Sequence, residues 1–384
     1  LTTNTTGPNN AASGYNALYN NTTSFNTAVG ASALYSQTTG YDNTAVGRFA
    51  LLDNSTGTNN VAIGMNALEN NTTASYNTAV GKSTLAATTT GGNNIAMGYR
   101  ALYLNTTANN NTAVGFNSLI LNTTGHSNTG VGGYSLDANT TGASNTAVGK
   151  SALSGNTTAS YNTAVGEEAL NANSTGAANT GIGYFALRAN TTGADNVAVG
   201  WSAMEDNTEG GYNTAVGHHA LSTNTTGNHN TAFGRYSLKV ATTATGNSGF
   251  GQGTLYSTTT GDKNTAVGYH ALEANTTAAN NTAVGYNSLN ANTTGITNTG
   301  LGYRALTANT TGNYNVGIGA DSLLANTTGT SNVALGFSAL DSNTTGSNSI
   351  AIGYYAGGAN TTGNITAIGY LSLDANTTGT LNTA

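Results

Sequence analysis

The sequence predicts an all-β fold: a parallel β-solenoid, or β-roll, of about 22 coils that runs through residues 1–384 as a single repeat array. Glycine recurs every 17 residues from Gly30 to Gly353, and only the spacings 14–30 and 353–369 are 16 residues. Repeats this short cannot bury a core alone and are stabilised by stacking on identical neighbours. Asn, Thr and Gly are poor helix formers, whereas 17 residues suit one turn of a β-coil with corners.

The residues just before each repeat glycine, which we number as position 0, alternate like a strand. From Gly30 onward position −1 is always bulky and apolar, as in Val148, and position −3 is β-branched nearly everywhere. Because positions −3 and −1 share a face at the strand period of two, the sequence predicts that position −1 forms a core ladder. Val148 is then expected between Val131 and Val165 inside the coil, with Leu153 at position +4 closing the same layer.

Position −2 lies on the other face of the same strand and is only Ala or Gly. This restriction indicates that another backbone lies close against it. We interpret the −2 face as a contact with other copies of the chain, and packing within the same coil is the alternative. The interface candidates are Ala62, Ala113, Gly130, Gly181, Ala198, Gly249 and Gly300.

Beyond position 0 the alternation fails. Position +2 accepts charged residues, position +3 is Ala, Ser or Thr, and position +4 is almost always Leu, so the chain is expected to turn or bulge here. Residues 17 apart should be neighbours in successive coils, which predicts contact between Lys150 and Glu167 and a ladder of Tyr269, Tyr286 and Tyr303.

Asn recurs at positions +7 and +13, and hydroxyl residues fill positions +8 and +9. Identical Asn side chains stacked about 4.8 Å apart can hydrogen-bond along the stack. The Asn-Thr-Thr triplets are also N-glycosylation sequons that a corner would expose, although the same residues could serve the ladders alone. The glycosylation candidates are Asn139, Asn156, Asn190, Asn309 and Asn326.

Composition argues against several functions. With 9 basic and 15 acidic residues and a net charge of −6, the chain offers no basic surface for nucleic acid. Cysteine is absent, and no apolar run approaches the length of about 18 residues that a membrane span needs. The start resembles no signal peptide, and we expect the chain to be a mature or excised segment of a longer protein.

Catalysis needs unlike groups that converge in one pocket, whereas a uniform array repeats the same side chains. We therefore expect no enzyme activity, no cofactor and no catalytic residue. His218, His219 and His229 lie close in sequence but occupy variable positions, so we predict no metal site.

The segments 59–64, 93–98 and 348–353 carry the pattern Asn-(Asn/Ser)-(Val/Ile)-Ala-(Ile/Met)-Gly. This pattern resembles the head repeats of trimeric autotransporter adhesins. The resemblance implies a left-handed parallel β-roll and a homotrimer that packs about a common axis through a small-residue face. The fuller repeat, as in residues 145–158, also looks like repeat regions of phage tail-fibre-like proteins.

We therefore expect an extracellular, oligomeric structural fibre or stalk on a cell surface or filament, adhesive in function, with a host-surface component or glycan as ligand. The alternative is the receptor-binding shaft of a phage tail fibre on a virion. A third class, the ice-binding solenoid, is less favoured because the adjacent threonines at +8 and +9 should point to opposite faces.

Overall fold

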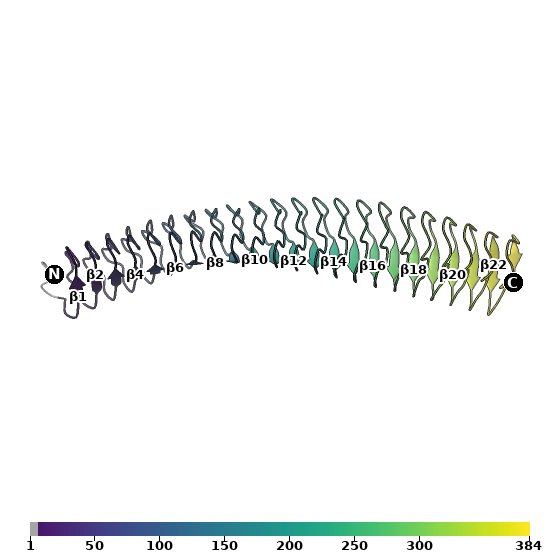
Figure 1. The fold of residues 1–384 in the computed structure, drawn as a ribbon, viewed down its shortest axis with the longest axis horizontal. Helices are drawn as coiled ribbons and strands as arrows, with labels where there is room; N and C mark the ends of the chain where they lie inside the picture. Colours follow the sequence, from purple (N-terminus) through teal and green to yellow (C-terminus); the bar gives the residue numbers. More distant parts are fainter. Residues whose placement is uncertain (1–6) are drawn as a thin grey trace. The chain divides into compact units, whose positions relative to one another are not determined.

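The computed structural model describes residues 7–384, which contain β-strands and turns and no helix. The chain divides into unit 1, residues 1–194, and unit 2, residues 195–384. Each unit is a parallel β-solenoid with one short strand per coil (Figure 1). Unit 1 contains β1 (Ala11–Ser13), β2 (Thr27–Val29), β3 (Thr44–Val46), β4 (Val61–Ile63), β5 (Thr78–Val80), β6 (Ile95–Met97), β7 (Thr112–Val114), β8 (Thr129–Val131), β9 (Thr146–Val148), β10 (Thr163–Val165) and β11 (Thr180–Ile182). Unit 2 contains β12 (Val197–Val199), β13 (Thr214–Val216), β14 (Thr231–Phe233), β15 (Ser248–Phe250), β16 (Thr265–Val267), β17 (Thr282–Val284), β18 (Thr299–Leu301), β19 (Val316–Ile318), β20 (Val333–Leu335), β21 (Ile350–Ile352), β22 (Ile365–Ile368) and β23 (Asn382–Thr383).

Successive strands within a unit pair in parallel and in register, as the 17-residue period predicts. Val165 of β10 lies beside Val148 of β9, and the other positions of these strands match in the same way. The stacked neighbours expected from the sequence are confirmed. Lys150 Nζ lies 3.3 Å from Glu167 Oε1. Ring centroids in the ladder of Tyr269, Tyr286 and Tyr303 are 5.5 and 5.4 Å apart.

The predicted corner after the repeat glycine is a turn over positions +1 to +6. Its non-glycine residues at +2 and +4 are left-handed, as in Ser151 (φ 55°) and Leu153 (φ 51°). A left-handed conformation costs an L-residue about 1 kcal/mol or more. Backbone hydrogen bonds between coils offset that cost. Leu153 N donates to Ala169 O at 3.0 Å, and Ser151 N donates to Gly133 O at 3.0 Å. The hydrogen-bonded ladder therefore continues past the strand and around the turn.

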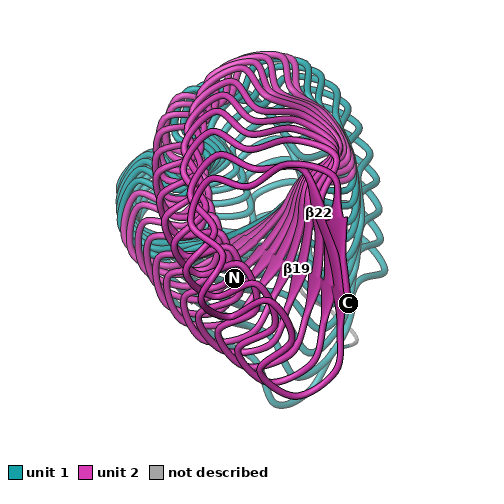
Figure 2. Ribbon diagram, turned by 90° about the vertical axis from the view of Figure 1, so that its right-hand side faces the viewer, with its two compact units in different colours: residues 1–194 teal, residues 195–384 magenta. Residues whose placement is uncertain are grey.

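The coil interior is built from positions −2, +3, +4, +7 and +13. In one coil these are Ala147, Ala152, Leu153, Asn156 and Asn162, all with an exposed fraction of 0%. Figure 2 shows the coils as closed loops, with the strands of unit 2 along one wall. The prediction that Leu at position +4 lies in the interior is confirmed.

The prediction of a core ladder at position −1 is wrong. Val148 is 37% exposed, while its neighbour Ala147 is fully buried. A 17-residue coil encloses little room, and the wall formed by positions +3 and +4 lies close to the strand. A Cβ added to Gly130 at position −2 would stand 2.7 Å from Ser118 Oγ and 3.4 Å from Leu119 Cδ1. Only Ala or Gly fits there, so the strand turns its bulky side chains outward.

In two coils the use of Gly rather than Ala at position −2 follows the same limit of space, whereas Gly181 lies between two alanines and has no such explanation. Each −2 residue packs between two +3 residues, one from its own coil and one from the preceding coil. Where both carry hydroxyls, position −2 is Gly: Gly130 lies between Ser118 and Ser135, and Gly249 lies between Ser237 and Thr254. This pattern is visible in the sequence, and sequence analysis missed it.

The 16-residue coil 353–369 keeps its interior filled by an exchange of positions. Gly357 stands where other coils have Leu at +4, and Ile365 stands where they have Asn at +13. Ile365 is 1% exposed, and a Cβ on Gly357 would lie 2.8 Å from Ile365 Cδ1. The isoleucine side chain thus occupies the space that leucine fills elsewhere.

Candidate functional site

The sequence-predicted interface at position −2 is not on the surface. Ala62, Ala113 and Ala198 have an exposed fraction of 0%. The remaining candidates, Gly130, Gly181, Gly249 and Gly300, are also buried. These residues pack against the +3 and +4 wall of their own solenoid, which is the alternative that the sequence left open. A second copy of the chain cannot reach them, so the interpretation of this face as an intermolecular contact is corrected.

The sequon asparagines are interior as well. Asn156 Nδ2 donates to Asn139 Oδ1 at 2.8 Å and to Ala159 O at 3.1 Å. The five glycosylation candidates, Asn139, Asn156, Asn190, Asn309 and Asn326, all have an exposed fraction of 0%. Their amides are committed to the ladder, so the folded chain does not present them for glycosylation.

A second asparagine ladder runs along position +13, also as predicted. Asn162 N donates to Asn145 Oδ1 at 2.9 Å, and Asn162 Nδ2 donates to Gly176 O at 3.0 Å. Each asparagine side chain thus pairs with backbone groups at the bend before the strand. The hydrogen bonds between strands do not reach these groups. Both ladders satisfy buried polar groups, as a folded interior requires.

The surface that does face outward is what we call the outer strip: positions −3 and −1 of β2–β11 in unit 1 and of β12–β22 in unit 2. It contains only Ser, Thr, Val, Ile, Met, Phe and Leu, with no charged residue. Thirteen of its 21 side chains at position −1 are exposed by at least 36%, and the other eight are half-buried. The exposed ones are Val29, Val46, Ile63, Met97, Val148, Ile182, Phe233, Phe250, Val267, Leu301, Leu335, Ile352 and Ile368. A contiguous exposed apolar surface of this kind is typical of an interaction site.

Positions +1, +2 and +5 form a second surface, which we call the variable corner because its side chains differ from coil to coil. Eight of the nine basic residues of the chain lie on it: Arg48, Lys82, Arg100, Lys150, Arg188, Arg235, Lys239 and Arg304. All of these except Lys150 lie over an aromatic ring, at 4.4 to 5.9 Å from the centroid.

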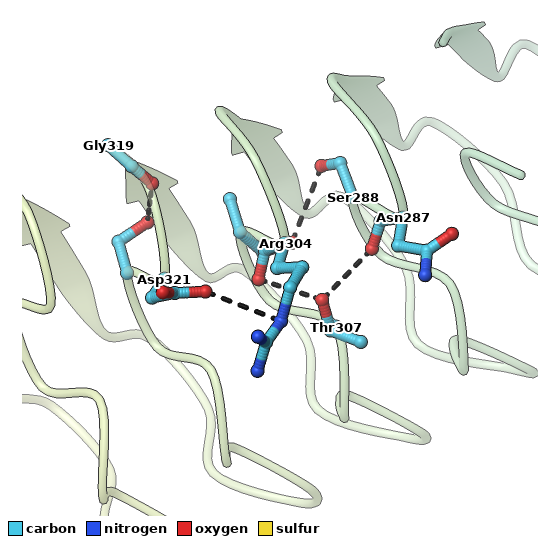
Figure 3. A network of polar contacts seen from close by, with 8 residues as sticks. Asn287, Ser288, Arg304, Thr307, Gly319 and Asp321 are labelled. Carbon is cyan, nitrogen blue, oxygen red and sulfur yellow. Dashed lines mark hydrogen bonds and ion pairs between the residues drawn. The ribbon is translucent and has the colours of Figure 1, made fainter. Parts of the chain in front are cut away.

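Some cations of the variable corner also have acidic partners in the next coil. Arg304 Nε lies 3.4 Å from Asp321 Oδ1, and Figure 3 shows this pair beside Thr307. Thr307 Oγ1 lies within hydrogen-bonding distance of two backbone carbonyl oxygens, 2.8 Å from Arg304 O and 2.9 Å from Asn287 O. The corner therefore combines a fixed backbone with side chains that are free to vary.

The histidines considered for a metal site lie at separate places. His218 and His219 have ring centroids 4.4 Å apart, whereas His229 stacks on Tyr212 at 5.1 Å. Among residues 7–384, no group of three or more His, Cys, Asp or Glu side chains is placed to hold a metal ion. Burial lowers the pKa of His219, and the neighbouring His218 and Lys239 lower it further.

No protein-family model matches this chain, and a search of curated proteins finds no match. Nor do residues 7–384 contain a helix with the length and apolar character that a membrane span requires.

Proposed function

We propose that this chain is part of an extracellular structural fibre that assembles with other copies of itself through the outer strip. The observation that carries this proposal is the strip itself: each strand from β2 to β22 displays apolar or hydroxyl side chains and no charge. Exposing such a surface to water along a whole unit is unfavourable, and association would remove it from water.

The repeat favours a second copy as the partner. A surface that covers the strip must present apolar groups at the strand spacing of about 4.8 Å. Another copy of the chain does so on every coil, with no charge to desolvate. The homotrimer about a common axis and the left-handed coil implied by the adhesin resemblance are part of this proposal, with the outer strip in place of the small-residue face.

The available area is close to what a specific assembly needs. Positions −3 to −1 span about 10 Å along the strand, and ten strands at about 4.8 Å span about 48 Å. The ten strands β2–β11 of unit 1 thus offer a face of about 480 Å² per chain, or about 960 Å² for a pair, which is close to the roughly 1,000 Å² that a specific interface needs.

The adhesive role rests on the variable corner. Binding residues often lie on variable segments that a rigid scaffold positions, and here an invariant coil carries different side chains at +1, +2 and +5. A host-surface component or glycan is the ligand class we propose, whether the fibre stands on a cell or, as the alternative, on a virion. Ice binding is less favoured: the +8 hydroxyl is used internally, as when Thr157 Oγ1 donates to Ser174 O at 3.1 Å.

The test is the mass of the chain in solution. The triple variant Val148→Asp, Val165→Asp and Ile182→Asp places three carboxylates on adjacent coils of the strip. We expect the parent chain to be a trimer by light scattering and the variant to be a monomer with an unchanged circular dichroism spectrum, because an interface cannot bury unpaired charges.

The matched control places the same three charges on the same coils at position +9, as Thr141→Asp, Thr158→Asp and Thr175→Asp. Position +9 is exposed and already carries Glu209 in one coil. This control should retain the parent mass. A monomeric parent chain, or a strip variant with the parent mass, would contradict the proposal.

A further inference from the structure

Acidic residues are unevenly distributed along unit 2. None of the 15 Asp and Glu residues lies between positions 210 and 261, although the chain as a whole has a net charge of −6. The same segment contains Arg235, Lys239 and three of the five histidines. This stretch of about three coils is therefore locally basic.

The structure gathers these cations with aromatic rings on the variable corner. The guanidinium carbon of Arg235 lies 4.4 Å from the ring centroid of Tyr236. Lys239 Nζ lies 4.9 Å from the same centroid and 5.4 Å from that of Tyr256. The rings of His218 and His219 lie 5.5 and 5.9 Å from Tyr236. We call these six residues, His218, His219, Arg235, Tyr236, Lys239 and Tyr256, the aromatic–basic patch.

The cations of the patch have no acidic partner. Within the described part of the chain, neither Arg235 nor Lys239 forms an ion pair, whereas Lys150 pairs with Glu167 on the same corner. Their polar contacts within the patch are with phenol oxygens: Arg235 Nη2 lies 3.1 Å from Tyr236 Oη, and Lys239 Nζ lies 3.4 Å from Tyr256 Oη. Arg235 is exposed and Lys239 is half-buried, so both cations remain open to an external anion.

We infer that the aromatic–basic patch binds an acidic saccharide, a sugar chain that carries carboxylate or sulfate groups. The guanidinium of Arg235 can hold such an anion through two parallel hydrogen bonds, and Lys239 supplies a second point charge. The tyrosine rings offer apolar area for the C–H faces of a sugar and hydroxyls for its polar groups. Because the patch continues over three coils, it suits an extended sugar chain better than a single small anion.

This inference rests on the proposed adhesive function, since it names where and by what chemistry the fibre holds its ligand. It can fail independently of self-assembly. The patch lies at positions +1, +2 and +5, and the outer strip lies at positions −3 and −1, so oligomeric mass and saccharide binding are separate measurements.

His219 adds a pH dependence to the binding. Burial lowers the pKa of His219, as do the charges of His218, Lys239 and Arg235, and only Glu205 raises it. The ring is therefore neutral near pH 7 and gains a proton as the pH falls below its ordinary range. That proton adds positive charge beside Arg235 and Lys239, so an anionic saccharide should bind more tightly at acidic pH.

The experiment measures binding of the full chain to four immobilised probes: heparin, which is sulfated; polygalacturonate, which is carboxylated; neutral dextran; and single-stranded DNA. We expect binding to heparin, polygalacturonate or both, with the preferred one identifying the acidic group. The double variant Arg235→Ala and Lys239→Ala should bind at least tenfold more weakly, and its mass should equal that of the parent. Lys150→Ala, which removes an ion-paired cation from the same corner, is the matched control and should bind as the parent does.

A third variant, Tyr236→Leu, separates sugar recognition from charge alone. It retains both cations and should weaken binding severalfold if the ring contacts the sugar. Unchanged binding by the double variant, equal binding to dextran, or tighter binding to DNA than to both acidic polysaccharides would each overturn the inference. Equal loss with Lys150→Ala would do so as well, because it would show only a general effect of charge.

Discussion

Ala147 and Val148 are adjacent on β9, yet they belong to opposite sides of the solenoid. The smaller residue has an exposed fraction of 0%, and the larger one is 37% exposed. The same contrast recurs on the strands from β2 to β22, where the central residue is buried and the bulky residue after it is exposed or half-buried. In a coil this narrow, only a small side chain of the strand fits in the interior. The bulky apolar side chains lie outside, where they can contact other molecules.

The largest effect should come from charging the inner face. Ala147→Asp places a carboxylate in a space that admits only a methyl group and offers it no partner, so we expect a loss of several kcal/mol in the free energy of unfolding. The neighbouring coils should share the loss because stability in a stacked array is a sum over adjacent repeats. Thermal and urea unfolding would measure it.

Val148→Asp is the matched change on the outer face. We expect little loss of stability from it under conditions in which the chain is monomeric, since its carboxylate would face water. Equal destabilisation by Ala147→Asp and Val148→Asp would refute the contrast between the two faces.

A smaller but still large effect should follow from cutting an asparagine ladder. Asn156→Ala leaves Asn139 Oδ1 without its donor, removes one of the two donors to Ala159 O, and removes one of the two acceptors of Asn173 Nδ2. A buried acceptor left unpaired costs about 1 to 3 kcal/mol and the two other lost hydrogen bonds add about 1 kcal/mol, so we expect a loss of about 2 to 4 kcal/mol in the free energy of unfolding. Thr158→Ala, two residues away on the exposed side, should change stability by less than about 0.5 kcal/mol. A similar result for both variants in urea unfolding would show that the ladder contributes nothing specific.

The packing rule at position −2 predicts an intermediate effect that can be reversed. The Cβ introduced by Gly130→Ala would stand 2.7 Å from Ser118 Oγ and 3.0 Å from Ser135 Oγ. Overpacking of this kind costs about 1 to 3 kcal/mol. Adding Ser118→Ala and Ser135→Ala should recover much of the lost stability, measured as the melting temperature.

Gly181→Ala is the control for this rule. Gly181 lies between two alanines at position +3, and a Cβ added to it would meet no atom closer than 3.2 Å. We expect it to be milder than Gly130→Ala. No rescue of Gly130→Ala by the two serine substitutions would show that the hydroxyls do not set the choice of Gly.

The smallest effect concerns Asp137 at position +5 of the variable corner. Burial raises its pKa, although hydrogen bonds from its own backbone, the Ser154 side chain and Ala138 oppose the shift. A raised pKa in the folded state means that this group contributes most stability below its ordinary pKa, and that the contribution is lost as the pH rises through the folded value. Asp137→Asn should therefore raise the melting temperature slightly at pH 7 and leave it unchanged at pH 3. A gain of equal size at both pH values would exclude titration as the cause.

Much of the fold was predictable because equivalent positions in successive repeats can be compared within the one sequence. The spacing of Gly30 and its successors determined the coil length and the in-register stacking, and hence the contact of Lys150 with Glu167. The Asn residues at +7 and +13 predicted the two ladders, and the failure of alternation near Leu153 predicted a turn. The structure bears out each of these, since they depend only on which residues recur in step.

The candidate sites were harder to predict. The sequon asparagines, such as Asn156, suggest either glycosylation or a ladder, and only the direction of the side chain decides between them. In the sequence the cations and aromatic residues are scattered along the chain. They lie together in the structure because the turn brings positions +1, +2 and +5 to one corner. The rule that relates Gly130 to Ser118 and Ser135 is present in the sequence, but its meaning requires knowing that positions −2 and +3 face each other.

By itself the sequence determined the period, the register and the division of each strand into a small face and a bulky face. Only the tertiary structure decided which face is inside. An alternating pattern is symmetrical in this respect, since a strand with Ala147 inward and one with Val148 inward have the same period of two. The coil closes with Leu153 and the +3 residues close to the strand, and the narrow space left there admits a methyl group but not an isopropyl group. That closure places the apolar ladder on the surface, where other molecules can reach it.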